Sequence, residues 1–215
     1  MSIILYSYFK SSAAFRVRIA LNIKAIKYKT KPIHLLKKGG EQHHPEYLEL
    51  NPQGLVPTLQ TEEQMISQST AIIEYLEETY PSPALLPDDA FDRAYVRSLA
   101  QIIACDIHPL NNLRVLQYLQ KHWHNEDDKH SWYQHWIEKG FSAFEKRLIE
   151  NDNKGLFCFG YTPGIADAFL IPQVYNALRF NSDLKPYPLI KGIYDNCMQQ
   201  TAFAKAAPEN QPDAE

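Results

Sequence analysis

The chain has 215 residues, of which 45% are apolar and 22% are charged, and its formal net charge is -3 at pH 7. This length is enough for one large domain or two modest ones with ordinary packed cores. There is no basic run to bind nucleic acid, no apolar segment long enough to cross a bilayer, and no pattern of a secretory signal at the N-terminus. We therefore expect a soluble cytoplasmic protein with neither a nucleic-acid nor a membrane partner.

The cysteines and histidines do not predict a metal site. Cys105, Cys158 and Cys197 are far apart and form no CxxC pair, so we expect reduced thiols. Four of the eight histidines lie within residues 122–135, among tryptophans and charges of both signs. Their spacing matches none of the usual ligand patterns, and a solvated helix junction is the favoured interpretation.

The chain begins with a strand, a turn and a helix. Residues 3–6 form an apolar run that predicts a buried strand, and helical spacing of apolar residues begins at Ala13. Ser11 and Ser12 therefore fall at the start of a helix, where unpaired N–H groups and the positive end of the dipole could stabilise an anion such as a thiolate. On spacing alone the ordinary alternative, in which Ser12 caps the helix, is favoured.

Two arginines interrupt the apolar surface of this first helix. Its apolar residues form two ridges, which predicts burial on two sides. Arg16 and Arg18 lie between the ridges. Either they face a cleft that receives anions, or they are solvated or salt-bridged.

The rest of the first domain alternates short strands and helical turns. Residues 27–36 predict a second strand, parallel to the first, and residues 45–50 predict one or two helical turns. Pro57 interrupts an apolar run, so we expect a cis bond before it and a Val56 backbone free to pair with a peptide-like ligand. A strand at 64–67 then leads into a helix at 70–80, where Ser69 either caps the helix or binds a carboxylate.

Beyond the prolines at 81–87, the pattern is entirely helical. It predicts helices at 89–119 with a break at Pro109, and at 132–150, 165–177 and 188–199. Gly164 and Asp167 form a variant of the capping box at the start of the third of these. The tail after Ala207 is expected to be disordered. The expected fold class is a small α/β domain followed by an all-α domain.

This layout resembles the cytosolic glutathione transferases, and the motifs resemble their zeta class, the maleylacetoacetate isomerases. Residues 11–21 read SSAAFRVRIAL, and the class signature has two serines, a cysteine, a small residue, an aromatic and then RVRIAL. The similarity continues through most of the chain, at residues 51–52, 56–59, 68–69, 71–78, 85–87, 109–110, 112–113, 166–167, 172–174 and 176–180.

The resemblance implies a fold, an activity and an assembly. It implies a thioredoxin-like glutathione-binding domain at residues 1–82 and a helical substrate domain at 88–215. The implied activity is glutathione-dependent cis–trans isomerisation of maleylacetoacetate to fumarylacetoacetate in tyrosine and phenylalanine breakdown, with possible transferase side activity. The implied protein is a homodimer that binds a maleyl diacid, with glutathione as cofactor and no metal.

The resemblance also assigns roles to individual residues. Ser11, with Ser12 beside it, is the implied catalytic hydroxyl that binds the glutathione sulfur, and Arg179 and Arg16 are the implied partners of the substrate carboxylates. The implied glutathione contacts are Ser11, Ser12, Ala13, Ala14, Phe15, Arg16, Gln42, Val56, Gln68, Ser69, His108, Asn112, Leu113 and Arg114.

Two departures from the class leave the substrate open. Ala13 replaces the class cysteine, so isomerisation would rely on the glutathione thiol alone. His108 stands where many relatives have glutamine, and residues 106–114 look closer to bacterial members, including maleylpyruvate isomerases of gentisate breakdown. Conjugation or dehalogenation by a general glutathione transferase is another alternative. A binding protein without chemistry is a third, against which the presence of Ser11, Gln68 and Ser69 counts.

Overall fold

The computed structural model describes residues 3–62, 64–122 and 126–215, which form two compact units. The first unit comprises Met1–Leu85 together with Met198–Glu215, and the second comprises Leu86–Cys197. The resemblance placed residues 198–215 in the helical domain, whereas here they cluster with the first unit. Contacts with the first helix account for this difference, because the Asn22 side chain donates a hydrogen bond of 2.9 Å to the Ala202 carbonyl.

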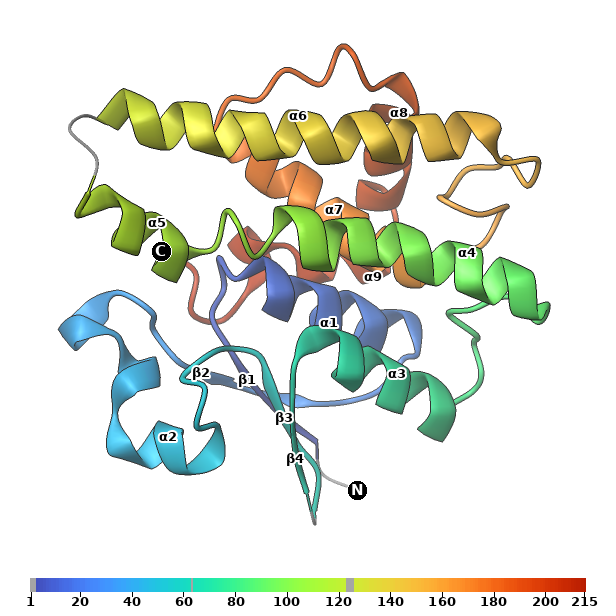
Figure 1. Ribbon diagram of the computed structural model, residues 1–215. Helices are drawn as coiled ribbons and strands as arrows, with labels where there is room; N and C mark the ends of the chain where they lie inside the picture. The colour runs from blue at the N-terminus through green and yellow to red at the C-terminus, as the bar shows by residue number, and fades with distance from the viewer. Residues whose placement is uncertain (1–2, 63, 123–125) are drawn as a thin grey trace. The chain divides into compact units, whose positions relative to one another are not determined.

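A mixed four-stranded sheet forms the centre of the first unit (Figure 1). Its strands are β1 (Ile4–Ser7), β2 (Lys29–Pro32), β3 (Thr58–Gln60) and β4 (Met65–Ser67), in the order β2-β1-β3-β4. β1 pairs with β2 in parallel, with Leu5 opposite Thr30, while β3 is antiparallel to both β1 and β4. The predicted strands and the parallel first pair are confirmed.

Helices cover both faces of this sheet because side chains alternate along β1. α1 (Ser12–Ile23) and α3 (Ser69–Thr79) pack together on one face, toward which Leu5 points. Tyr6 points to the other face and joins an aromatic cluster with Tyr8, Phe9 and Tyr47, the last of which comes from α2 (Pro45–Leu50). The loops that carry the predicted site residues therefore leave a sheet that is packed on both sides.

The proline-rich segment after α3 is tied to the first unit by a buried ion pair. Lys24 Nζ lies 2.7 Å from Glu77 Oε2 and donates to the carbonyls of Tyr80 and Pro83. Both Glu77 carboxylate oxygens accept from the Leu85 N–H. These contacts explain why the first unit extends to Leu85.

The C-terminal segment is ordered, so the prediction of disorder after Ala207 is wrong. α9 (Thr201–Ala206) packs against α1, and a short 3₁₀ helix (Pro208–Asn210) follows it. The Gln211 side chain is buried and donates to the carbonyls of Lys205 and Ala207 at 2.8 and 2.9 Å. The segment is also tied to a distant part of the chain, because Asp213 accepts the Phe9 N–H. A contact across so many residues leaves no periodic signal in the sequence.

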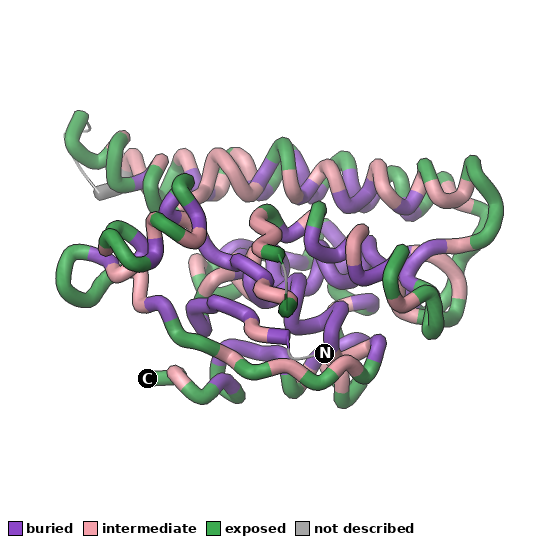
Figure 2. Tube along the Cα trace, turned by 90° about the horizontal axis from the view of Figure 1, so that it is seen from below, coloured by how far each residue is buried: buried purple, intermediate pink, exposed green. Residues whose placement is uncertain are grey.

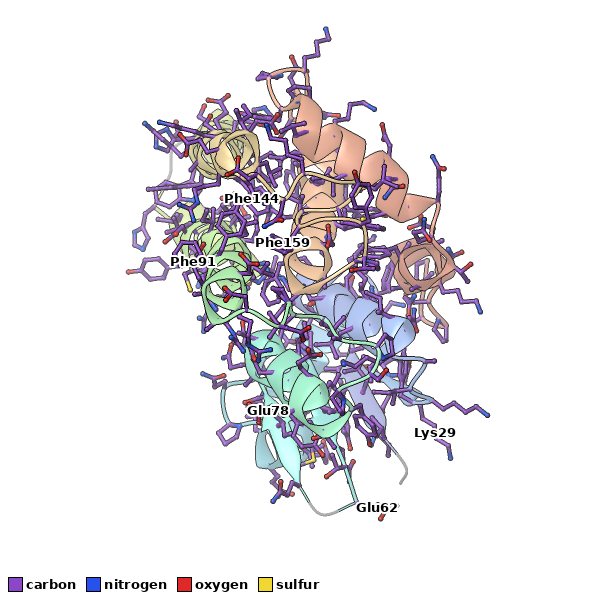
Figure 3. All side chains as sticks on the ribbon, turned by 90° about the vertical axis from the view of Figure 1, so that its right-hand side faces the viewer. Lys29, Glu62, Glu78, Phe91, Phe144 and Phe159 are labelled. Atoms are coloured by element: carbon purple, nitrogen blue, oxygen red, sulfur yellow. The ribbon has the colours of Figure 1, made fainter. Side chains whose placement is uncertain are left out.

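The described part of the second unit is helical, as predicted. It contains α4 (Ala90–Gln101), a π-helical segment (Ile102–Ile107), α5 (Leu113–Gln120), α6 (Glu126–Glu150), α7 (Ile165–Arg179) and α8 (Pro188–Met198). The expected break near Pro109 separates the π-helical segment from α5. Buried and exposed positions alternate along α6 (Figure 2). Phe144 lies inside this unit and Phe91 at its surface (Figure 3).

Two local features explain how the helices of the second unit pack. A Cβ atom at Gly140 would lie 2.1 Å from Ile107 Cδ1, so only glycine lets α6 approach the π-helical segment this closely. Asp167 confirms the predicted capping box, since its carboxylate accepts the N–H groups of Gly164 and Cys158, each at 2.8 Å.

Among the described residues, none of the helices is both long and apolar enough to cross a membrane.

Candidate active site

Ser11 is the N-cap of α1. Its Oγ accepts the Ala14 N–H at 3.2 Å, and its own N–H donates to the Tyr8 carbonyl at 2.9 Å. Ser12 is the buried first residue of the helix, so the expectation that Ser12 is the cap is wrong. Because Ser11 Oγ acts as an acceptor toward Ala14, its O–H group can still donate to an anion at the positive end of the helix.

The residues after Ser12 differ in what they could offer a ligand. The side chains of Ala14 and Phe15 are fully buried, and Phe15 is part of the core. Ala13 is half-buried, and its methyl group occupies the position of the class cysteine. Ala14 and Phe15 could therefore contribute to a ligand site only through their backbone, at a helix end where N–H groups are aligned.

The two arginines of α1 are both buried. Arg18 donates to the carbonyls of Ala206 at 2.8 Å and Phe9 at 3.0 Å. It is fully buried, and this burial lowers its pKa to about 10. The expectation that Arg18 faces a cleft or solvent is wrong, because it joins parts of the first unit. Arg16, which is 2% exposed, donates from Nη1 to Ser69 Oγ at 3.3 Å and so links the starts of α1 and α3.

The loop before β3 presents an unpaired backbone. The bond between Val56 and Pro57 is cis, as predicted. The preceding carbonyl, that of Leu55, accepts from the Tyr47 hydroxyl at 2.6 Å and from Asn51 Nδ2 at 2.8 Å. Within the described residues, the Val56 backbone forms no hydrogen bond, although this residue is only 9% exposed. Such a group is costly to leave unpaired and is ready to pair with a peptide-like ligand.

Gln42 carries a second polar group that lacks a partner. The side chain is 8% exposed, and Oε1 accepts no hydrogen bond from the described part of the chain. A Cβ atom at Gly40, whose φ is 97°, would lie only 2.6 Å from Gln42 Nε2. Glycine at position 40 therefore allows both this left-handed turn and the position of the Gln42 amide.

The start of α3 combines a strained residue with a buried hydroxyl. Gln68 is the N-cap and has a φ of 73°, which is uncommon for a residue other than glycine. Its Nε2 donates to Gln53 Oε1 at 2.7 Å. Ser69 is buried and receives the hydrogen bond from Arg16. Backbone strain of this kind is often found at ligand sites.

The predicted residues of the second unit lie at helix ends. Asn112 caps α5, with its Oδ1 accepting the Arg114 N–H at 3.1 Å, and its Nδ2 lies 3.4 Å from His108 Nε2. Leu113 and Arg114 are exposed. Arg179, also exposed, ends α7 with its guanidinium carbon 5.2 Å from the centre of the Phe180 ring.

Tyr133 lies near Arg179 and stacks on the same Phe180, with 3.9 Å between ring centres. Burial raises the pKa of Tyr133, and the positive charge of Arg179 opposes this rise. Tyr133 is therefore a neutral hydrogen-bonding group at physiological pH. The guanidinium of Arg179 can attract an anion to this part of the second unit without a competing negative charge from Tyr133.

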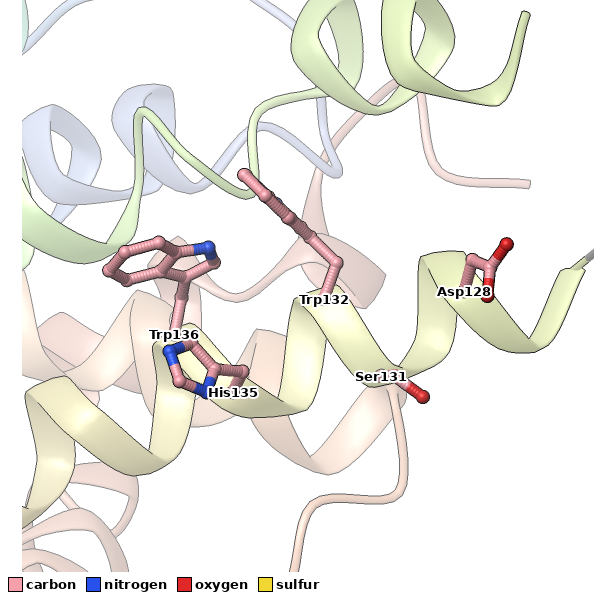
Figure 4. Close-up of a pocket in the computed structure, with 5 residues that line it drawn as sticks. All are labelled: Asp128, Ser131, Trp132, His135 and Trp136. Carbon is pink, nitrogen blue, oxygen red and sulfur yellow. The ribbon is translucent and has the colours of Figure 1, made fainter. Parts of the chain in front are cut away.

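A pocket on α6 contains none of the predicted site residues (Figure 4). It is lined by Asp128, Ser131, Trp132, His135 and Trp136. Trp132 Nε1 donates to the Leu110 carbonyl at 2.9 Å. In the described parts of the chain, no three His, Cys, Asp or Glu side chains could hold a metal ion together. His124, one of the clustered histidines, lies outside the described residues.

Sequence reasoning missed the residues that form hydrogen bonds to the candidate site residues and to the loop that carries Val56. Tyr47 and Asn51 hold the Val56 loop, and Gln53 contacts Gln68. The turn residues at 51–54 were a signal that this loop is fixed, but no pattern shows that a tyrosine on α2 reaches the Leu55 carbonyl. These supports come from residues that are close in space because of tertiary packing.

Comparison with known proteins gives a consistent result. Residues 5–84 match the family model described as glutathione S-transferase, N-terminal domain. The chain is 51% identical to a probable maleylacetoacetate isomerase of Vibrio cholerae, over 100% of this chain and 99% of that relative. It resembles a holo structure of a bacterial zeta-class maleylpyruvate isomerase, with a TM-score of 0.96, 47% identity, and coverage of 99% and 100% of the two chains.

A second solved structure carries ligands. It is a maleylacetoacetate isomerase from Methylobacterium extorquens with bound malonate and glutathione, and the match has a TM-score of 0.93 and 38% identity. The alignment covers 99% of each chain. These similarities span both compact units of the chain.

Proposed function

Because the chain belongs to the zeta class of glutathione transferases, the family of the maleylacetoacetate isomerases, we propose that it converts maleylacetoacetate to fumarylacetoacetate with glutathione as cofactor. This reaction belongs to tyrosine and phenylalanine breakdown. The geometric observation that carries the proposal is the Ser11 hydroxyl at the N-cap of α1. We also propose the cytoplasm as its location and the homodimer, usual in this family, as its assembly.

The residues of the first unit fit a tripeptide. The unpaired Val56 backbone offers a donor and an acceptor for the central peptide group of glutathione, and the buried Gln42 side chain has an unfilled polar atom for the glycine end. Gln68 and Ser69 lie at the N-terminus of α3, where the aligned N–H groups favour binding of the γ-glutamyl carboxylate.

The full set proposed to hold glutathione comprises Ser11, Ser12, Ala13, Ala14, Phe15, Arg16, Gln42, Val56, Gln68, Ser69, His108, Asn112, Leu113 and Arg114.

The main catalytic task of the chain is to keep a thiol ionised. When bound, glutathione supplies a thiolate that adds to the conjugated double bond, permits rotation, and is eliminated unchanged. Lowering a thiol pKa by about two units requires roughly 2.7 kcal/mol. A helix terminus supplies about 0.3–1 kcal/mol, and a hydrogen bond to a charged group about 1.5–3 kcal/mol. The Ser11 hydroxyl therefore contributes more than the dipole, and Ser12 supports it as the first residue of the helix.

The diacid substrate requires a cationic partner. We assign this role first to Arg179, whose exposed guanidinium can form two parallel hydrogen bonds with a carboxylate. Arg16 is the second choice, because it is buried and already donates to Ser69. Its contact with Ser69 suits a role in holding the γ-glutamyl end of glutathione.

Maleylpyruvate is the alternative substrate. The observation that favours it is the TM-score of 0.96 to a maleylpyruvate isomerase, together with His108 in place of glutamine. Both substrates are cis diacids with the same conjugated bond, so the same Ser11 and Arg179 would serve either reaction. Conjugation by a general glutathione transferase uses the same thiolate but consumes it.

One assay tests the proposal. Purified protein is mixed with maleylacetoacetate or maleylpyruvate and substoichiometric glutathione, while substrate absorbance and free thiol are followed together. We expect many turnovers per glutathione with no loss of thiol, and the ratio of kcat/KM for the two diacids identifies the preferred one. Stoichiometric loss of thiol would instead show conjugation, and absence of turnover would indicate a binding protein.

A further inference from the structure

We propose that Asp213, in the C-terminal segment, is a positioning residue that holds the Ser11 loop, residues 8–11, in its active geometry. Asp213 Oδ2 accepts the Phe9 N–H at 3.0 Å, across 204 positions of the sequence. The inference rests on the proposed function, because it concerns the hydroxyl that is to bind the glutathione sulfur. Asp213 itself has no role in the chemistry proposed above.

A buried cation, Arg18, also binds this loop. Arg18 donates from Nη2 to the Phe9 carbonyl at 3.0 Å and from Nη1 to the Tyr8 carbonyl at 3.4 Å and to Ser7 Oγ at 3.1 Å. The Phe9 peptide groups are therefore held by a guanidinium at the carbonyl and by a carboxylate at the N–H. Burial lowers the pKa of Arg18, and Tyr28 and then Asp213 oppose this effect.

The loop transmits its position directly to Ser11. The Tyr8 carbonyl accepts both the Arg18 hydrogen bond and the Ser11 N–H, the latter at 2.9 Å. The Ser11 carbonyl in turn accepts the Phe15 N–H at 2.9 Å, within α1. A shift of the Phe9 peptide would therefore move the serine that caps the helix. Hydrogen bonds to an anion depend steeply on distance and angle, so even a small shift matters.

The C-terminal segment is anchored well enough to act as such a support. Gln211 binds the carbonyls at the end of α9, and Glu215 forms an ion pair with Lys37. Asp213 lies between these two anchors. Its Oδ1 is buried and accepts no hydrogen bond from the described residues, which costs stability. A carboxylate that is only half satisfied is better explained by what it holds than by a contribution to folding.

The experiment uses the full chain and three substitutions. Asp213→Ala removes the acceptor, whereas Asp213→Asn keeps an oxygen that can accept the Phe9 N–H but removes the charge. Glu78→Ala is the control, because it removes one negative charge from an exposed position of α3 in the same unit (Figure 3). For each variant we would measure kcat/KM against pH, the unfolding temperature, and hydrogen exchange of residues 8–11.

We expect Asp213→Ala to lower kcat/KM about tenfold, because Ser11 is no longer held in the geometry that stabilises the thiolate. The midpoint of its pH profile should rise by about half a unit, since a displaced Ser11 stabilises the thiolate less. Exchange of residues 8–11 should become faster. Asp213→Asn should recover most of the activity, and Glu78→Ala should match the unsubstituted protein in all three measurements.

A purely structural role predicts a different result. If Asp213→Ala lowers the unfolding temperature but leaves the pH profile and the exchange of residues 8–11 unchanged, the inference is overturned. If that variant does not fold, the same three measurements on Asp213→Asn and Asp213→Ser decide whether Asp213 positions residues 8–11. The serine side chain is too short to reach the Phe9 N–H, whereas the asparagine side chain can accept it. A parallel Ser11→Ala variant separates the two ideas, because normal turnover there would overturn the proposed function rather than the role of Asp213.

Discussion

The two units hold their candidate residues in different ways. In the first unit, Ser11 caps a helix, the Val56 backbone is presented by a supported loop, and Arg16 is buried against Ser69. In the second unit, Arg179, the proposed partner of the substrate, is exposed at the end of α7. Backbone and buried groups suit an invariant cofactor, and exposed side chains suit a substrate that differs between relatives. Substitution of Ser11 in the first unit should therefore change the chemistry, and substitution of Arg179 in the second should change substrate affinity.

The largest expected effect is on the stability of the second unit. Asp167 is fully buried and accepts two backbone N–H groups, so Asp167→Ala would leave both unpaired. We expect the free energy of unfolding to fall by about 3–4 kcal/mol, measured by urea denaturation. The free energy of unfolding should fall by less in Asp167→Asn, because the asparagine can still accept one of the N–H groups. A loss below about 0.5 kcal/mol for the alanine variant would mean that the loop is held by other contacts.

The next largest effect tests the chemistry of the first unit. Ser11→Ala removes the hydroxyl that is to stabilise the thiolate, and we expect kcat to fall about 100-fold, equivalent to about 2.7 kcal/mol. The fold should be retained, as judged by circular dichroism. Ser11→Thr is the matched variant, since it keeps a hydroxyl at the same position and should recover much of the rate. Turnover near that of the unsubstituted protein in Ser11→Ala would contradict the assignment.

A smaller effect is expected at the surface of the second unit. Arg179→Ala should raise the KM for the diacid about tenfold, because one charged hydrogen-bonding partner of a carboxylate is lost, while glutathione affinity stays the same. Lys185→Ala, which removes another exposed cation of the same unit, is the control and should leave both constants unchanged. Weaker glutathione binding in Arg179→Ala would show that this arginine serves the cofactor instead.

The smallest effect concerns two buried thiols of the second unit. Burial is the main cause that raises the pKa of Cys158 and of Cys197, and Asp167 raises both further. The folded thiols therefore keep protons that the unfolded chain loses above its ordinary thiol pKa, so stability must fall as pH rises. From pH 8 to pH 9 we expect a loss of about 1 kcal/mol in the free energy of unfolding. Cys158→Ala with Cys197→Ala should make this dependence flatter, and an unchanged slope would contradict the explanation.

Local patterns were enough to predict most elements and some of the local geometry at the candidate site. The strands, the cis bond before Pro57 and the Asp167 cap follow from spacing and from the chemistry of single residues. The motifs also led to the correct family. What failed depended on distant partners, because nothing near Arg18 in the sequence shows that the Ala206 carbonyl will receive its hydrogen bond. The order of the C-terminal tail was missed for the same reason, since Asp213 meets the Phe9 N–H only after folding.

The central claim is that Ser11 holds the sulfur of bound glutathione as a thiolate, and ultraviolet titration of that thiolate tests it most directly. The absorbance of the glutathione complex would be followed against pH for the unsubstituted protein and for Ser11→Ala. In the unsubstituted protein, we expect the pKa of the glutathione thiol to lie about two units below its ordinary value of about 8.5. In Ser11→Ala, this pKa should return most of the way to the ordinary value. Equal pKa values in the two proteins would contradict the account.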